Sequence, residues 1–241
     1  MGGSKKYKGK LCVYCRVNQS TTADHVFPRE LFQLEHRGLL PKVPSCEKCN
    51  NEKSKLEHYL TAVLPFGGTH IDAETALSVD AAKRLKRNQK LQDRLRESAK
   101  DIVLQSSTGT VENRLAVAFD SDSLHNLVGF IGRGLIWHHW GAYLPIESSF
   151  KVFTPSEAGI EFLHNLFNLS TKYRVNTTSL SVDTVRYKGV MSESDMGLSV
   201  WAIQFLGGTT VVDEDSNSIF KNSFVAMVTG SPESLSKLEL V

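Results

Sequence analysis

Two Cys-x-x-Cys pairs constrain this chain more than any other feature. Cys12 and Cys15 form the first pair, Cys46 and Cys49 form the second, and the 241 residues hold no other cysteine. Two thiolates separated by two residues can both face one metal ion from a tight turn, and four thiolates complete the tetrahedral shell of a structural zinc site. The spacing therefore predicts a closed zinc site that stabilises an N-terminal region too short for a large core.

Metal binding is favoured over disulfides because the N-terminus shows no secretory signal. Lys5, Lys6, Lys8 and Lys10 are not followed by an apolar run, and no apolar stretch reaches membrane-spanning length. Paired Cys-x-x-Cys motifs in a reducing compartment are typical of metal sites. The sequence thus predicts a cytoplasmic protein with no membrane partner.

The charge is divided unevenly along the chain, although the formal net charge is only +2. Residues 1–101 hold 19 Lys and Arg against 12 Asp and Glu, whereas residues 102–241 hold 9 against 14. A basic half that carries a metal motif suits a polyanion such as nucleic acid, and an acidic half does not.

Three polar residues accompany the cysteines. Asp24 and His25 lie between the two pairs, and Asn50 follows Cys49 directly. The oxygens of Asp and Asn are ligands for a hard cation, which retains waters and accepts further ligands from phosphate. A neighbouring His can take the proton from a water aligned with a phosphodiester.

The series Cys-x-x-Cys, Asp-His-Val-x-Pro and Cys-x-x-Cys-Asn-x-x-Lys, within residues 11–63, resembles the HNH endonucleases in their zinc-knuckle form. The resemblance implies a ββα-metal fold in which His25 is the general base. It also implies that Asp24, from the first strand, and Asn50, from the helix, bind a catalytic magnesium or manganese ion. The four cysteines would hold the structural zinc, and Lys53 would lie near phosphate.

The activity that the resemblance implies is hydrolysis of phosphodiester bonds in nucleic acid, with double-stranded DNA as the expected substrate. The products would carry 5′-phosphate and 3′-hydroxyl ends, and the expected setting is restriction or anti-phage defence. One motif per chain cuts one strand, so cleavage of both strands requires a homodimer or two events. A protein partner bound through the C-terminal region is a further expectation.

The chain departs from the family pattern at two positions. The family has an Asn shortly before the second Cys pair, near Pro41 or Lys42 here, and this chain has none. Some members have a His one helical turn after the Asn50 position, where this chain has Ser54. Glu57 and His58 are close by on the same expected helix and are interpreted as helix surface or as residues supporting the metal ligands.

The overall prediction is an α+β protein in three parts. Residues 1–67 form the nuclease domain with its zinc, residues 68–105 form a basic helical linker, and residues 106–241 form an α+β domain with an antiparallel sheet. Within the linker one helix is expected over residues 80–105, with Asp80 as its N-cap. Its charged face is either simply solvated or contacts phosphates.

The C-terminal part alternates between helical and β-rich patterns. Gly129, Gly132 and Gly134 are expected to permit close packing of the first helix, and His138 and His139 are expected to be packing residues. The expected helices are Leu124–Tyr143 and Pro155–Leu169, the expected strands are Tyr173–Val190, Ser199–Phe205, Thr209–Val212 and Phe220–Val228, and Gly207-Gly208 is the expected hairpin turn between two of these strands.

Two rival functions remain beside the nuclease. The first is a zinc-stabilised nucleic-acid-binding module without catalysis, which would need only the cysteines and a basic surface. The presence of Asp24, His25 and Asn50 together favours the nuclease over that module. The second is an effector nuclease that is triggered by a ligand or partner held in the C-terminal domain.

Overall fold

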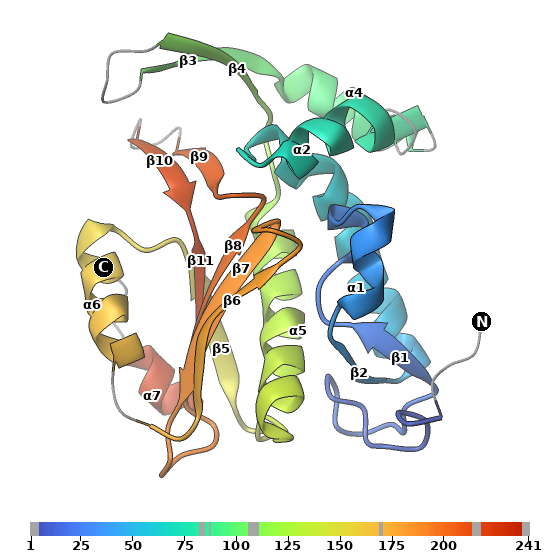
Figure 1. The fold of residues 1–241 in the computed structure, drawn as a ribbon, viewed down its shortest axis with the longest axis vertical. Helices are drawn as coiled ribbons and strands as arrows, with labels where there is room; N and C mark the ends of the chain where they lie inside the picture. The colour runs from blue at the N-terminus through green and yellow to red at the C-terminus, as the bar shows by residue number, and fades with distance from the viewer. Residues whose placement is uncertain are drawn as a thin grey trace.

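A computed structural model describes residues 5–81, 85–86, 88–105, 111–168, 171–213 and 218–237. Its centre is an antiparallel five-stranded sheet (Figure 1). In spatial order the strands are β5 (Ser149–Phe153), β11 (Val225–Gly230), β8 (Ser199–Phe205), β7 (Val185–Met191) and β6 (Arg174–Leu180). Alternate residues of β8 enter two different core clusters, Trp201 and Ile203 on one side and Val200 and Ala202 on the other. The sheet therefore has two buried faces, and the α+β prediction is confirmed at this level.

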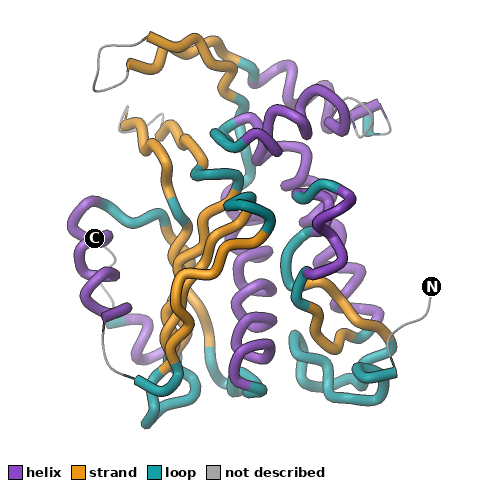
Figure 2. The backbone as a smooth tube through the Cα atoms, viewed as in Figure 1, coloured by secondary structure: helices purple, strands orange, loops and turns teal. Residues whose placement is uncertain are grey.

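Helices cover both faces of the sheet (Figure 2). Helix α5 (Ser121–Trp140) lies against one face, while α6 (Glu157–Asn168) and α7 (Pro232–Ser236) lie against the other. The carboxylate of Asp120 caps α5 by accepting from two backbone amides, and Gly141 ends the helix with φ of 65°. The helices predicted over Leu124–Tyr143 and Pro155–Leu169 are both present, as α5 and α6, with shifted ends.

Helix α5 also contacts the N-terminal region on its opposite side. A Cβ added to Gly132 would lie 1.9 Å from Met227 of the sheet, and one added to Gly134 would lie 3.1 Å from Val26. One continuous cluster of buried side chains runs from Cys12 through α5 to Met227. The regions predicted as separate N-terminal and C-terminal domains thus share a hydrophobic core.

The N-terminal region is a strand hairpin followed by a helix. Strand β1 (Thr22–His25) pairs antiparallel with β2 (Lys42–Ser45), and α1 (Glu47–Val63) begins directly afterwards. The link between the strands contains the 3-10 turns η1 (Arg29–Leu31) and η2 (Leu34–Leu39). The observed order in this region is strand, strand, helix.

The single helix predicted over residues 80–105 is wrong. Before this range the structure has η3 (Leu64–Phe66) and α2 (Ile71–Thr75). Within it lie the end of the π-helical turn η4 (Ala76–Ala81), then α4 (Gln89–Ser98) and β3 (Lys100–Gln105), which forms a hairpin with β4 (Val111–Ala116). Residues 82–84 and 87 of the predicted helix are outside the described residues. Asn88 caps α4 through a bond from Leu91 N, so this helix starts later than Asp80. On α4 only Leu91 and Leu95 are buried, so the helix has a short apolar stripe and ends at Ser98. The β-branched Ile102 and Val103 that follow pair with β4 instead.

Two predictions for the C-terminal strands also need correction. The run Tyr173–Val190 is two strands, β6 and β7, joined by a turn in which Ser181, Val182 and Asp183 have positive φ. Gly207-Gly208 does form a turn, with φ of 76° and 110°, but not a hairpin between paired strands. The reason is that β8 pairs with β7 and β11, whereas β9 (Thr209–Asp213) pairs with β10 (Ser218–Ser223).

The Gly207-Gly208 turn connects the sheet to the N-terminal region. The carbonyl of Leu206 accepts hydrogen bonds of 2.9 Å from the backbone amides of Thr69 and His70.

Over the ranges that the structure describes, no helix combines the length and apolar character that crossing a bilayer demands.

Candidate metal centre and catalytic site

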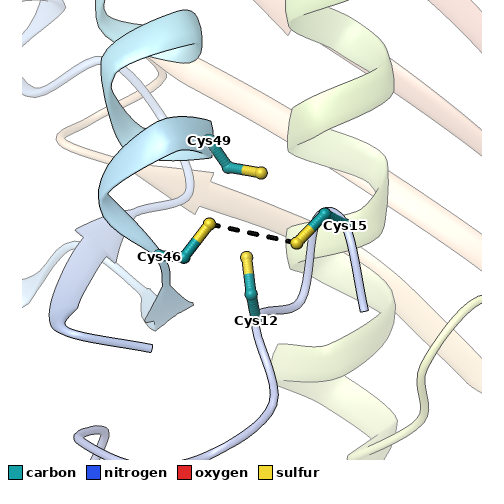
Figure 3. A group of neighbouring side chains, drawn as sticks. All are labelled: Cys12, Cys15, Cys46 and Cys49. Atoms are coloured by element: carbon teal, nitrogen blue, oxygen red, sulfur yellow. Dashed lines mark hydrogen bonds between the residues drawn. The ribbon is translucent and has the colours of Figure 1, made fainter. Parts of the chain in front are cut away.

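The two Cys pairs lie on adjoining turns. Cys12 and Cys15 occupy a tight turn closed by a 3.0 Å bond from Arg16 N to the Cys12 carbonyl. Cys46 is the N-cap residue of α1 and Cys49 lies in its first turn. A 3.0 Å bond from Val13 N to the carbonyl of Pro44 on β2 brings the two turns together. Figure 3 shows the four side chains converging beside α5.

The four sulfurs lie within 4.8 Å of one another, and Cys15 Sγ is 3.9 Å from Cys46 Sγ. Zn–S bonds of about 2.3 Å in a tetrahedron place sulfurs about 3.8 Å apart, so the cluster is compatible with a structural zinc site. Asn18 Nδ2 donates to Cys46 Sγ at 3.8 Å. Burial raises the pKa of Cys15, but backbone donors at Asn18 and Val17 outweigh it and bring the pKa to about 7. Burial raises the pKa of Cys12 and Cys49, so a bound metal ion would have to displace the protons of those thiols.

Asp24 lies on β1 and its carboxylate is buried. One carboxylate oxygen, Oδ2, has two partners. Tyr14 donates its hydroxyl to Oδ2 at 2.6 Å, and the ammonium of Lys53 lies 3.1 Å from the same oxygen. Lys53 also donates to the His25 carbonyl at 2.7 Å and pairs with Glu57. Since Lys53 is on α1, it ties the strand that carries Asp24 and His25 to the helix. In the described part of the chain, Oδ1 of Asp24 has no hydrogen-bond partner.

Asn50 lies on α1 three residues before Lys53, so both side chains project from one side of the helix, the side that contacts Asp24. The Asn50 carboxamide is half-buried and makes no hydrogen bond to any residue that the structure describes. Asp24 and His25 thus lie on β1 and Asn50 lies on α1, and Lys53 of α1 joins the two elements through its contacts with Asp24 and the His25 carbonyl.

His25 follows Asp24 on β1 and is half-buried. Burial lowers the pKa of His25, and the positive charge of Lys42 lowers it further, against the opposing effect of Asp24. The imidazole is therefore neutral at pH 7, the form that can accept a proton.

Lys53 and its surroundings differ from their sequence interpretation. Lys53 was expected near phosphate, but its side chain has no exposed surface and points to Asp24. Glu57 pairs with Lys53 and its side chain is only 18% exposed, so of its two interpretations helix surface does not apply; His58 is exposed, as a surface residue would be. Tyr14, the donor to Asp24, was missed, because an aromatic inside a Cys pair carries no signal for that role.

Of the two adjacent histidines of α5, His139 is a packing residue, as predicted, whereas His138 is exposed. His139 Nε2 is 3.1 Å from the hydroxyl of Tyr187, and its ring contacts Trp201 at 6.1 Å between centroids. Burial lowers the pKa of His139 to about 4. Among the described residues, the four cysteines are the only group of three or more His, Cys, Asp or Glu close enough to share an ion.

No protein-family model matches the chain, and neither the curated proteins nor the solved structures searched include a match.

Proposed function

We propose that this protein is a metal-dependent endonuclease of the HNH type that hydrolyses phosphodiester bonds of double-stranded DNA. The observation that supports this most is the β1–β2 hairpin followed by α1, which carries Asp24, His25 and Asn50 beside a tetracysteine cluster. The cysteines hold the hairpin and helix together, and Lys53 fixes the relation of Asp24 to α1.

The donor chemistry suits a catalytic magnesium or manganese ion. Asp24 offers its unengaged Oδ1, and Asn50 offers a carboxamide oxygen without a hydrogen-bond partner in the described chain. Hard divalent cations prefer such oxygens and keep several waters. When bound, the cation would stabilise the charge on the phosphate and on the departing 3′ oxygen.

The chain's own residues would then perform three tasks. The neutral imidazole of His25 takes the proton from the attacking water. Tyr14 and Lys53 orient the Asp24 carboxylate by holding Oδ2. Attack on the phosphorus leaves 5′-phosphate and 3′-hydroxyl ends.

Exposed basic residues beyond the site, interspersed with the acidic Asp93 and Glu97, support a nucleic-acid partner. Lys86 and, on α4, Lys90, Arg94 and Arg96 are exposed. Neutralising phosphates with such side chains releases counterions, which gives affinity without sequence preference. Binding to DNA through its phosphates is also expected of a nuclease that acts in restriction or anti-phage defence.

A zinc-stabilised binding module without catalysis is the second candidate. It is favoured by the engagement of Asp24 Oδ2 with both Tyr14 and Lys53, since an ammonium beside the carboxylate competes with a metal ion. The module would bind DNA but leave it intact in every divalent metal.

Incubation of a plasmid and of an end-labelled duplex with the zinc-loaded protein distinguishes the two. The proposal predicts nicks that require magnesium or manganese, with 5′-phosphate and 3′-hydroxyl ends. Retarded but uncut DNA in both metals would instead establish the binding module.

A further inference from the structure

A second polar site lies between the Cys turn and the C-terminal region. It is a pocket of about 220 Å³, to which both parts of the chain contribute. Tyr14, Cys15 and Arg16 line it from the first Cys turn, Arg133 from α5, and Ile146 and Ser148 from the segment before β5. No carboxylate is among its lining residues. The volume lies below the about 300–1,000 Å³ of pockets for drug-sized ligands, so a small group suits it.

Arg133 brings an uncompensated charge to this pocket. Its guanidinium makes no hydrogen bond or ion pair with any residue in the described ranges, and its contact is the ring of Phe150 at 5.0 Å. Burial lowers the pKa of Arg133, and the one opposing influence is Cys49. Arg133 is half-buried, so part of its charge remains solvated, and an anion in the pocket would compensate the part that burial desolvates.

Arg16 supplies a second guanidinium at an energetic cost to the backbone. Its φ is 55°, a left-handed conformation that glycine adopts freely and that is unfavourable for a long side chain. Nη1 donates to the carbonyl of Leu144 at 2.5 Å, which fixes the group at the pocket. Nε is buried and has no partner among the described residues, so one donor remains to be satisfied.

The thiolates of the Cys cluster are the obvious alternative partners for these two cations. A tetrathiolate zinc site carries a net negative charge, and Cys15 lines the pocket. However, neither Arg16 nor Arg133 donates to a sulfur, whereas Asn18 does so at 3.8 Å. The guanidiniums therefore have donors left for a ligand in the pocket.

We propose that this pocket binds a phosphate group. Planar guanidinium groups bind phosphate oxygens through paired N–H donors, and two arginines, Arg16 and Arg133, line the pocket together with Ser148. The phosphate comes either from a free mononucleotide or from the backbone of nucleic acid. The site is separate from Asp24, His25 and Asn50, and the inference does not depend on catalysis.

The test uses the full-length, zinc-loaded protein and follows thermal unfolding and calorimetric titration with inorganic phosphate, a mononucleotide monophosphate and a short DNA duplex. The wild type is expected to bind at least one of these saturably. Arg133→Gln is expected to weaken that binding by tenfold or more, with an unchanged zinc content. Arg186→Gln is the matched control, because Arg186 lies on β7 beside Asp183 and away from the pocket.

Arg16→Gly is a second variant that keeps the proposal testable if Arg133→Gln fails to fold. Glycine adopts the left-handed backbone of position 16 without strain, and the substitution removes the second guanidinium. It should retain the fold and lose phosphate binding. Binding of phosphate or mononucleotide identifies a small ligand, and an effect of the variants on the duplex alone identifies the nucleic-acid backbone. Equal binding of all probes by wild type, Arg133→Gln and Arg16→Gly, or loss of zinc from Arg133→Gln, would overturn the proposal.

Discussion

The ammonium nitrogen of Lys53 lies 3.1 Å from Asp24 Oδ2, and the Lys53 side chain is completely shielded from solvent. The same nitrogen bonds the His25 carbonyl and pairs with Glu57. Replacing one partner of a buried ion pair leaves an uncompensated charge, which typically costs about 3–5 kcal/mol. Lys53 is thus the residue on which the geometry between β1 and α1 depends.

Lys53→Met should therefore lower the free energy of unfolding by about 3–5 kcal/mol at pH 7, measured by denaturant titration. The deficit should shrink towards acid pH, because burial raises the pKa of Glu57 and a protonated Glu57 needs no cation. Lys55→Met on the exposed side of α1 is the control and should change stability by less than about 0.5 kcal/mol. An equally small effect of Lys53→Met would contradict the role of the ion pair.

Removal of the metal should unfold more than the Cys turns. Cys12, Cys46 and Cys49 belong to the same buried cluster as α5 and the central sheet. The purified protein should contain about one zinc per chain, and Cys46→Ser should lose both the metal and most of its helical circular dichroism. Chelator treatment followed by zinc addition is the control for reversibility. A zinc-free protein of unchanged stability would refute a structural role for the cluster.

Gly189 lies opposite Trp201 in the β7–β8 ladder, and the indole covers its Cα. A Cβ at this position would lie 2.4 Å from the ring, and Trp201 is fully buried. Gly189→Ala should therefore destabilise the protein by about 1–3 kcal/mol, seen as a lowered midpoint of thermal unfolding. Gly38→Ala is matched to it, because nothing lies within 4 Å of the added Cβ. Equal midpoints for the two variants would show that the sheet repacks freely.

His139 should make stability fall in mild acid. Its pKa drops from 6.5 to about 4 on folding, through burial and the neighbouring His138, so the unfolded chain binds the proton more readily. The stabilisation is complete above pH 6.5 and is lost as the pH falls towards 4, by about 1–2 kcal/mol after solvent screening is considered. His139→Gln should flatten the stability profile between these pH values, and His164→Gln, at an exposed position of α6, should not.

The sequence was most informative where chemistry dictates spacing. Four cysteines in two pairs predicted one cluster, and the sulfurs do converge. The helix over residues 80–105 was wrong because a charged segment with a narrow apolar stripe leaves the choice to tertiary contacts. There the pairing of Ile102 with Arg114 in a hairpin prevailed over helix propensity.

The surroundings of the candidate site were harder to predict than its residues. The family resemblance implied a position near phosphate for Lys53. Its burial instead depends on how α1 docks against β1, which no local pattern encodes. The same holds for Tyr14 and Arg133, which meet their partners only through contacts between distant segments.

Cleavage of supercoiled plasmid by wild type, His25→Ala and His58→Ala is the most direct test of the central claim. His58 is a suitable control because it is exposed on α1. The nuclease proposal predicts magnesium- or manganese-dependent nicking by wild type and His58→Ala. It also predicts at least a hundredfold loss in a normally folded His25→Ala. Equal behaviour of wild type and His25→Ala in both metals would contradict it.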